Sequence, residues 1–398
     1  RSKLFIVALI AIFSLSVLLT GCLPDSGGSD ADKETVKIAF IGPLTGANAG
    51  QGTGAKNAFE LAIKQANESQ KYDYNFEMLT LDDASNPSVA ASAAKKAIAD
   101  PQVLAGCGFW NSPAADAAIP IFKSANMPLM IWGAIGPALT SAENYPLVTR
   151  ICPTMIQQTG PLAQFAVDQI GLKNWAVISD TTALGTGALA GWKEEMNARP
   201  DANLLSVDEI QVGTADFRPI LTKIKQANPD GIFLGLVTME AGLVTKQMHE
   251  LGMDNVMIIS LSGVVEDKYI EVASAAAAEG VVGCKPGKAI EALPGGQEFI
   301  DAYAAAGYAE MYGSYGPYAY DAANIIMEAI QSTGADKAKL PDAIAQSSYT
   351  GLLGTTSFSE IGQTTSIEIT EMIVDEGKWV NYDTSSYVQG TKKMRGLK

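Results

Sequence analysis

Short apolar segments alternate with helical segments along most of this chain, and that alternation limits its fold more than any other feature. Val36–Ile41 is expected to be the first strand, ending at Gly42-Pro43, and Phe76–Leu81 is expected to be a strand that Asp82-Asp83 closes. Between them, Asn57–Gln70 has apolar residues at helical spacing. Strands that alternate with helices form parallel sheets with right-handed crossovers. We therefore predict an α/β fold with mainly parallel sheets.

The same pattern returns in the second half of the chain, which predicts two Rossmann-like lobes in all. The expected strands there are Trp175–Ser179, Leu204–Gln211, Gly231–Leu236, Val256–Ser260 and Val281–Cys284. The expected helices are Ala188–Asn197, Phe217–Ala227, Glu240–Leu251, Gly296–Ala306 and Tyr318–Thr333, and late strands are expected at Thr355–Phe358, Ser366–Val374 and Lys378–Tyr382. Ligands of such sheets bind at the carboxyl ends of strands, so the cleft between two lobes is the expected site.

One stretch, Gly106–Thr140, combines several features of a small-molecule site. An apolar strand end stops at glycine, and Ser112-Pro113 then predicts a helix start, with serine as the N-cap and proline in the first turn. A helix N-terminus favours an anion such as a carboxylate. Phe109 and Trp110 add two aromatic rings at the same place. Two interpretations stay open: a cleft with a carboxylate anchor and an apolar lining, or an ordinary strand–helix loop with core aromatics.

The composition argues against several other functions. The net charge of −15 opposes nucleic-acid binding, because phosphate contacts need a basic surface. His249 is the only histidine and lies in a helical segment, so no Ser–His–Asp or Cys–His set can form. The sequence has no C-x-x-C pair, no G-x-G-x-x-G and no phosphate loop. We expect no metal, no cofactor, no nucleic-acid partner and no enzymatic activity.

The first residues are typical of a lipoprotein signal peptide, which we place at residues 1–21. Arg1 and Lys3 are basic, and Leu4–Leu19 is apolar but shorter than a comfortable membrane span. The segment ends in Leu-Thr-Gly before Cys22, which resembles the bacterial lipobox, whose cysteine is lipid-modified before cleavage. Cys22 would then carry an acyl anchor to the membrane; an uncleaved membrane anchor is the alternative. Residues 22–34, rich in Gly, Ser and Asp, are expected to be a flexible tether.

Six motifs along the chain carry a family resemblance through their order and spacing. They are I-A-F-I-G-P-L-T-G from residue 38, L-D-D-A-S-N-P from 81, G-F-W-N-S from 108, M-I-W-G-A-I-G-P-A-L-T from 130, T-A-D-F from 214, and Phe358-x-x-x-Gly362. Over residues 36–382 the chain resembles the branched-chain amino acid binding proteins of ABC importers, the type I periplasmic binding proteins.

The resemblance implies two lobes, joined by three crossover segments, that close on a ligand like a hinge. Lobe 1 would be residues 36–154 plus 286–353, and lobe 2 residues 155–285 plus 354–398. It also implies an extracytoplasmic receptor in the bacterial envelope, facing the periplasm or the cell exterior. Its partners would be a small-molecule ligand and the membrane subunits of an ABC importer, and we expect a monomer.

The family's ligand contacts carry over unevenly to this sequence. The ligand serine falls on Ser112, and a backbone carbonyl contact falls on Gly133. Ile135 replaces a threonine, Leu184 replaces a tyrosine, and Val237 replaces an aromatic residue. The remaining expected site residues are Trp110, Gln51 as a wall of the cleft, and Tyr315 at its apolar end.

These departures affect one end of the ligand more than the other. The residue that contacts the ligand carboxylate is kept at Ser112, whereas most residues that contact the ligand ammonium are lost. The family's acidic ligand residue falls among residues 261–263, where the nearest acid is Glu266. An ammonium ion removed from water needs acceptors, and losing one costs roughly 1.5–3 kcal/mol. Apolar and aromatic side chains that we expect to face the cleft are Phe109, Trp110, Trp132, Ile135 and Leu184. We hypothesise an apolar or aromatic carboxylate without an α-amino group; leucine, isoleucine or valine held by Glu266 or by backbone carbonyls is the alternative.

The family's frequent disulfide is absent here, because its two positions hold Ser85 and Asn111. Cys152 and Cys284 fall beside neighbouring crossovers, so a bridge between them is open in an oxidising envelope. The leading interpretation of the whole chain is a lipid-anchored solute-binding protein of an ABC importer. The alternative is a ligand-sensing receptor on the same fold that feeds a signalling partner.

Overall fold

The computed structural model describes residues 33–366 and 368–397. The chain divides into two compact units, Arg1–Glu34 and Thr35–Lys398, and the fold below is that of the second. The expected signal peptide, Cys22 and nearly all of the tether lie outside the described residues. Within the described part of the chain, no helix has the length and apolar character that crossing a membrane requires.

The first sheet is built from the N-terminal strands and is five-stranded, with the order β2-β1-β3-β4-β5. Its strands are β1 (Glu34–Gly42), β2 (Tyr74–Asp82), β3 (Val103–Gly108), β4 (Leu129–Ile131) and β5 (Val148–Arg150). β1 pairs with β3, β3 with β4 and β4 with β5, each in parallel. The helices that follow β1, β2 and β3 are α2 (Ala49–Glu68), α3 (Pro87–Ala99) and α4 (Ser112–Ser124).

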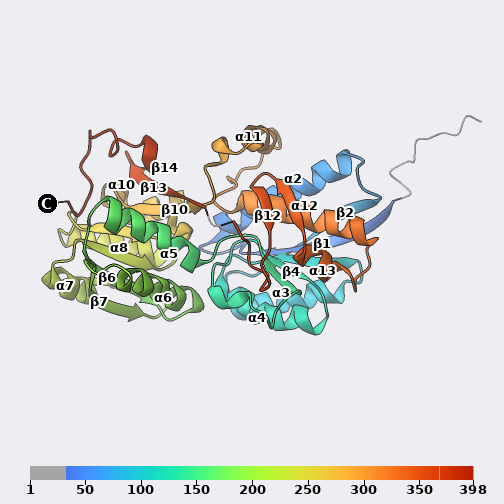
Figure 1. The fold of residues 1–398 in the computed structure, drawn as a ribbon, viewed down its shortest axis with the longest axis horizontal. Helices are drawn as coiled ribbons and strands as arrows, with labels where there is room; N and C mark the ends of the chain where they lie inside the picture. Colours follow the sequence, from blue (N-terminus) through green and yellow to red (C-terminus); the bar gives the residue numbers. More distant parts are fainter. Residues whose placement is uncertain (1–32, 367, 398) are drawn as a thin grey trace, which may run out of the picture. The chain divides into compact units, whose positions relative to one another are not determined.

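Two separate cores cover the two faces of this sheet. Alanine-rich α3 and α4 pack on one face, against Ala39, Ile41 and Ile131. α2 packs on the other face together with α12 (Gly316–Thr333), a helix from much later in the chain. Figure 1 shows α3 and α4 below the sheet and α2 and α12 above it. The alternation of buried side chains along β1 sends residues to both cores, as a fully covered parallel sheet requires.

The second sheet is seven-stranded, with the order β14-β13-β10-β9-β8-β6-β7. Its strands are β6 (Asn174–Asp180), β7 (Asn203–Ile210), β8 (Gly231–Gly235), β9 (Met257–Ser260), β10 (Val282–Pro286), β13 (Ile369–Asp375) and β14 (Lys378–Asn381). The five strands from β6 to β10 pair in parallel, whereas β13 and β14 add in antiparallel orientation at one edge. The prediction of mainly parallel α/β sheets is confirmed.

The other elements complete the helical layers and the connections. The helices are α5 (Met155–Ala163), α6 (Ala183–Asn197), α7 (Arg218–Ala227), α8 (Thr238–Glu250), α9 (Asp267–Ala273), α10 (Ala275–Ala278), α11 (Gly296–Ala305) and α13 (Leu340–Ala345), with a π-helical stretch at Gln164–Gln169. Short 3-10 turns occur at Pro137–Leu139, Ser262–Val264, Ile290–Ala292 and Tyr382–Thr384, and β11 (Ser348–Gly351) and β12 (Gly354–Ser357) form a separate hairpin. The chain passes between the two sheets after β5, after β10 and before β13.

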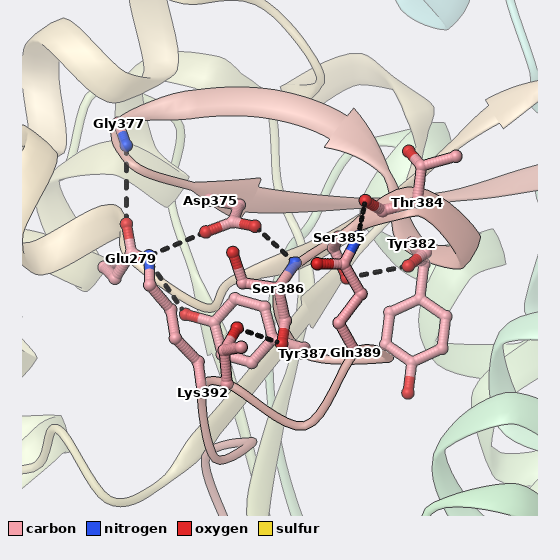
Figure 2. Close-up of polar contacts among 11 residues, drawn as sticks. Glu279, Asp375, Gly377, Tyr382, Thr384, Ser385, Ser386, Tyr387, Gln389 and Lys392 are labelled. Atoms are coloured by element: carbon pink, nitrogen blue, oxygen red, sulfur yellow. Dashed lines mark hydrogen bonds and ion pairs between the residues drawn. The ribbon is translucent and has the colours of Figure 1, made fainter.

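The C-terminal tail is tied to the edge of the second sheet. Lys392 Nζ lies 2.7 Å from Glu279 Oε1 and 2.6 Å from Asp375 Oδ1, and the Tyr387 hydroxyl donates to Glu279 at 2.9 Å. The backbone N–H of Ser386 donates to Asp375 Oδ2 at 2.7 Å. Figure 2 shows these contacts bringing the tail, the β13–β14 turn and Glu279 together. The residues after β14 are therefore held against the second sheet, and the N–H of Gly396 donates to the Asn255 carbonyl at the amino end of β9, opposite the carboxyl ends of the parallel strands.

Candidate ligand-binding site

A small apolar cavity lies at the carboxyl ends of strands from both sheets. From the first sheet it is lined by Trp110 and Asn111 after β3 and by Gly133 and Ile135 after β4. From the second it is lined by Leu184 at the start of α6, by Leu236 and Val237 after β8, and by Leu261 and Gly263 after β9; Tyr315, just before α12, completes it. The cavity measures about 20 Å³, which is room for about one water molecule.

Trp110 joins the two halves of the cavity wall. A Cβ atom added to Gly133 would lie 3.1 Å from Trp110 Cδ1, and one added to Gly263 would lie 3.6 Å from Trp110 Cζ2. The indole therefore lies against backbone from both sheets, and it is 6% exposed. Glycine at 133 is what allows this close approach, because a side chain there would have to displace the ring.

Ser112 begins α4 but does not cap it, which corrects the sequence-based prediction. Asn111 is the N-cap residue, and Ser112 and Pro113 are the first two helical residues. Ser112 is fully buried, and its Oγ accepts a hydrogen bond from the N–H of Gly136 at 3.0 Å. The serine therefore holds the β4 loop in place and lies behind the cavity wall. Its hydroxyl hydrogen is still a potential donor.

Asn111 is a cavity residue that the sequence did not single out as a ligand contact. Its Oδ1 is buried and has no hydrogen-bond partner among the described residues. Burying an amide oxygen unpaired is costly, so a polar atom of a ligand would relieve that cost. A side-chain amide offers a carbonyl acceptor in one orientation and an N–H donor in the flipped one. Asn111 can therefore meet either a hydroxyl or a carboxylate.

A fully buried arginine supports the β4 loop from beneath. Arg150 Nη1 donates to the carbonyl of Ala134 at 3.1 Å and to that of Gly136, and Nε donates to Gln363 Oε1 at 2.6 Å. Nη2 donates to Thr140 Oγ1 at 3.0 Å. No carboxylate in the described part of the chain forms an ion pair with this guanidinium. Burial lowers the pKa of Arg150 to about 10, so it keeps its positive charge at neutral pH.

The loop carbonyls that Arg150 binds point away from the cavity, and the intervening Ile135 carbonyl is also occupied. It accepts a hydrogen bond from the N–H of Met155 at 2.9 Å. With the carbonyls of Ala134, Ile135 and Gly136 all turned to the first crossover, the Ile135 side chain faces the cavity. Because Gln363 comes from a later crossover, the same network fastens the loop to two connections between the sheets.

Gln51 and Glu266 meet outside the cavity, in an adjoining groove of about 580 Å³. Gln51 Nε2 donates to Glu266 Oε2 at 2.8 Å, and the Thr238 hydroxyl donates to Glu266 Oε1. Burial raises the pKa of Glu266, while these two hydrogen bonds act in the opposite direction. Both carboxylate oxygens are thus engaged by the protein. The contact links α2 of the first sheet to the turn after β9 in the second.

Tyr315 is fixed by a polar chain at the back of the cavity. Its hydroxyl lies 2.5 Å from Ser262 Oγ, which donates to Gln158 Oε1 at 2.8 Å. Cys284 Sγ lies 3.5 Å from the same Gln158 oxygen. Cys152 and Cys284 are both buried free thiols, so the bridge that the sequence left open is not formed. Burial raises the pKa of Cys152 to about 12, which leaves it an unreactive thiol.

Six of the eight expected ligand-binding residues line the cavity: Trp110, Gly133, Ile135, Leu184, Val237 and Tyr315. Ser112 lies behind the wall, and Gln51 lies in the groove. Two aromatic residues expected to face the cleft belong to the core instead. Phe109 packs with α3 and α4, and Trp132 stacks on Phe40 with its Nε1–H donating to the Ile41 carbonyl at 3.1 Å. Cavity residues that the sequence did not single out are Asn111 and Leu236, while Leu261 and Gly263 belong to the stretch 261–263 on which the family's acidic ligand residue falls.

Comparison with known proteins places this architecture in a family. Residues 35–370 match the family model described as periplasmic binding protein. The chain belongs to this family. The match covers most of the chain and runs through both sheets and every loop that lines the cavity. Because the family consists of solute-binding proteins, the prediction of a binding protein rather than an enzyme is confirmed, as is a place outside the cytoplasm.

Individual relatives agree with the resemblance drawn from the motifs. The leucine-, isoleucine-, valine-, threonine- and alanine-binding protein of Pseudomonas aeruginosa is 28% identical over 345 residues, which is 85% of this chain and 89% of the relative. A solute-binding protein of an ABC transporter from Rhodopseudomonas palustris BisB5, solved with 3,4-dihydroxybenzoic acid, has a TM-score of 0.75 and 26% identity, covering 89% of this chain and 96% of its own.

A third relative supports the fold alone. The branched-chain amino acid transporter substrate-binding protein of Streptococcus pneumoniae, solved with isoleucine, has a TM-score of 0.79 at 22% identity, covering 87% of this chain and 98% of its own. The predicted type I periplasmic binding protein fold is thereby confirmed. Relatives of both ligand types thus share this fold, so the fold alone does not choose the ligand.

Proposed function

We propose that this chain is the lipid-anchored receptor of an ABC importer and that its ligand is an apolar or aromatic carboxylate without an α-amino group. The ligand would bind in the cavity between the two sheets. The residues proposed to contact it are Trp110, Asn111, Ile135, Leu184, Val237 and Tyr315, with Gly133 as a backbone contact. Ser112 and Gln51 would support the site from behind the wall and from the groove.

The observation that carries the ligand class is the lack of any charged side chain in the cavity lining of the described chain. An α-ammonium group moved there from water would need carboxylate or carbonyl acceptors. The nearest acid in the sequence, Glu266, lines the groove instead and already accepts hydrogen bonds from Gln51 and Thr238. A ligand without the amine avoids this cost.

The carboxylate end of such a ligand has several sources of stabilisation. The start of α4 offers backbone N–H groups at Ser112 and Ala114, since Pro113 has none, and a partial positive charge. The flipped amide of Asn111 adds a donor, and the Arg150 charge lies beneath the neighbouring loop. The relative solved with 3,4-dihydroxybenzoic acid supports an aromatic acid as the ligand class.

Leucine, isoleucine or valine is the second candidate, favoured by the relative that binds these amino acids. For them, Glu266 would have to give up the Gln51 amide and turn its carboxylate to the ligand ammonium. That exchange would remove a contact between the two sheets, which the ligand's own contacts would have to replace.

Ligand entry requires the two halves of the wall to separate. A cavity of about 20 Å³ holds about one water, whereas a benzoate-sized ligand needs several times that volume. Opening would part Trp110 from Gly263 and Gln51 from Glu266. We propose that these contacts re-form around the ligand, as in the hinge closure of other binding proteins. The lobe boundaries at residues 154, 285 and 353 are part of this proposal.

A thermal-shift experiment on the full chain tests the ligand class with matched pairs. Leucine is compared with 4-methyl-2-oxopentanoate, and phenylalanine with phenylacetate, so that each pair differs at the α-amino position. A ligand at about 100 times its Kd adds about 2.7 kcal/mol of stability, enough for a clear rise in melting temperature. We expect the amine-free acids to raise it. Stabilisation by the amino acids alone would rule out the proposed ligand class.

The proposed anchor is tested separately, because Cys22 lies outside the described residues. Expression of the full chain in a bacterium should give a membrane-bound product that carries acyl groups on Cys22. Cys22→Ser should leave the protein unprocessed and without acyl groups. A wild-type product of unmodified mass at this residue would contradict the anchor while leaving the receptor function standing.

A further inference from the structure

A second cavity, of about 310 Å³, lies beside the crossover that follows β10, and we call it the hinge cavity. It is bounded by Lys285 in β10, Trp379 in β14, Leu353 after the β11 strand, and Tyr312 and Tyr318 around the start of α12. It shares no lining residue with the small cavity of the proposed ligand site. Its volume is within the range of pockets that hold small organic ligands, whereas the other cavity measures only about 20 Å³.

Two hydrogen-bond donors in the hinge cavity have no partner in the described part of the chain. The Tyr318 side chain is only 5% exposed, and its hydroxyl makes no hydrogen bond; a Cβ on Gly287 would lie 2.9 Å from it. The Lys285 ammonium is half-buried and forms neither a hydrogen bond nor an ion pair. Protein interiors rarely leave such groups unpaired, so these two donors mark a place for an acceptor.

The charges around the hinge cavity favour an anion over a cation. Burial lowers the pKa of Lys285, while the charges of Glu291, an exposed residue of the cavity lining, and of Asp267 act the other way without reaching ion-pair distance. Lys288, at the rim, is already paired with Glu368 at 3.3 Å. A carboxylate beside Lys285 would supply the counter-charge that the half-buried ammonium lacks, and the Tyr318 hydroxyl would donate to its second oxygen.

The remaining lining residues determine which non-polar part of a ligand fits the hinge cavity. Tyr312 and Trp379 present aromatic surface, and Leu353 and Met372 present aliphatic surface. Aromatic walls favour a flat apolar group through stacking and area burial. A small inorganic anion would leave most of this surface and volume unfilled.

We propose that the hinge cavity is a second binding site, for a small aromatic carboxylate held by Lys285 and Tyr318. The site joins three strands of the second sheet to the start of α12, which packs on the first sheet. An occupant therefore contacts both sides of the hinge and adds interactions that depend on the angle between them. By thermodynamic linkage, it changes the affinity of the cleft for its ligand, and the cleft ligand changes its affinity in return.

The test uses 4-fluorobenzoate as the probe and fluorine NMR of the full chain as the readout. Lys285→Met and Tyr318→Phe remove one donor each from the hinge cavity. Gly263→Leu fills the cleft cavity instead, because its Cβ would already lie 3.6 Å from Trp110. The uncharged analogue 4-fluorobenzamide reports whether the charge of the probe matters.

We expect a bound fluorine signal that survives in Gly263→Leu, weakens at least tenfold in affinity in Lys285→Met, and is absent with the benzamide. Tyr318→Phe should weaken it by a smaller factor, and this variant also decides the matter if Lys285→Met does not fold. Loss of all bound signal in Gly263→Leu would overturn the proposal, as would a signal indifferent to both hinge substitutions. If the proposed cleft ligand were wrong, only the cleft signal would be missing, so the two proposals fail separately.

Discussion

Replacing Arg150 with methionine should destabilise the protein and weaken the binding of carboxylates in particular. The substitution keeps much of the apolar volume of the side chain but removes every donor of the guanidinium. The carbonyls of Ala134 and Gly136, the Thr140 hydroxyl and the amide oxygen of Gln363 each lose a hydrogen bond. All of these groups lie where water does not replace the donor.

The loss of stability in Arg150→Met depends on which of these acceptors still have another hydrogen-bond donor. Gln363 Oε1 keeps the Thr140 hydroxyl at 3.3 Å, and the Gly136 carbonyl keeps a long bond from the N–H of Leu139 at 3.4 Å. The Ala134 carbonyl keeps only the weak donor Cys152 Sγ at 4.0 Å. One largely unpaired acceptor costs about 1–3 kcal/mol, and the weakened charged bonds raise the total to about 3–5 kcal/mol.

Urea denaturation followed by circular dichroism and by tryptophan fluorescence measures this loss. Arg150→Lys keeps the charge with fewer donors and should fall between wild type and Arg150→Met. Arg218→Met is the matched control, since Arg218 is exposed and pairs with Asp216 and Glu250 at the surface. We expect a lower midpoint urea concentration for Arg150→Met and no clear change for the control.

Ligand affinities distinguish an electrostatic role of the Arg150 charge from a purely structural role. The loss of its charge should weaken phenylacetate more than phenylacetamide, because only the first carries a charge that the guanidinium attracts. An Arg150→Met protein with wild-type stability would refute the network argument. Equal loss for the acid and the amide would refute the electrostatic one.

Three other substitutions or treatments test separate parts of the structure. Burial raises the pKa of Asp321 from 3.8 to about 7, so folding takes up a proton at pH values between these two. The free energy of unfolding should therefore fall as the pH rises from about 4 to 7. In Asp321→Asn that fall should be smaller, and identical pH profiles for the two proteins would show that the Asp321 carboxyl titrates normally. Gly133→Val should abolish ligand binding with a modest loss of stability, because its Cβ would push Trp110 into the cavity, and calorimetry with unchanged affinity would contradict the wall described above. Without reductant, Cys152 and Cys284 should react with iodoacetamide only after unfolding, and a mass that shows no label on either would mean that they are bridged.

The layered fold was predictable because its local signals agree with one another. Apolar runs at Val36–Ile41 and Trp175–Ser179 stop at turn residues, and the structure has β1 and β6 there. The start of a helix differs from the prediction where two neighbouring residues could each serve as the N-cap. Asn111 precedes Ser112, so the chain enters α4 one residue earlier than the serine alone suggested. Boundaries of this kind depend on backbone geometry that a residue type does not determine.

Site residues close to the ends of strands were predictable from the sequence. Contacts between residues of the two lobes were not. Ile135 lies in the loop after β4 and Leu184 at the start of α6, just after β6, and both line the cavity. The Gln51–Glu266 contact joins residues 215 positions apart, and no local pattern announces it. Trp132 was misplaced because an aromatic residue beside a strand end suits a core as well as a cleft. Asn111 carries a visible signal in hindsight, as a polar residue at the start of the helix that faces the cleft.

The most direct test of the central claim is a calorimetric comparison of phenylacetate and phenylalanine on the full chain. The two differ at the group for which the cavity lining offers no charged partner. We predict that phenylacetate binds at least tenfold more tightly, equal to about 1.4 kcal/mol. Tighter binding of phenylalanine would mean that an acceptor such as Glu266 turns to the ligand, and that the receptor takes amino acids after all.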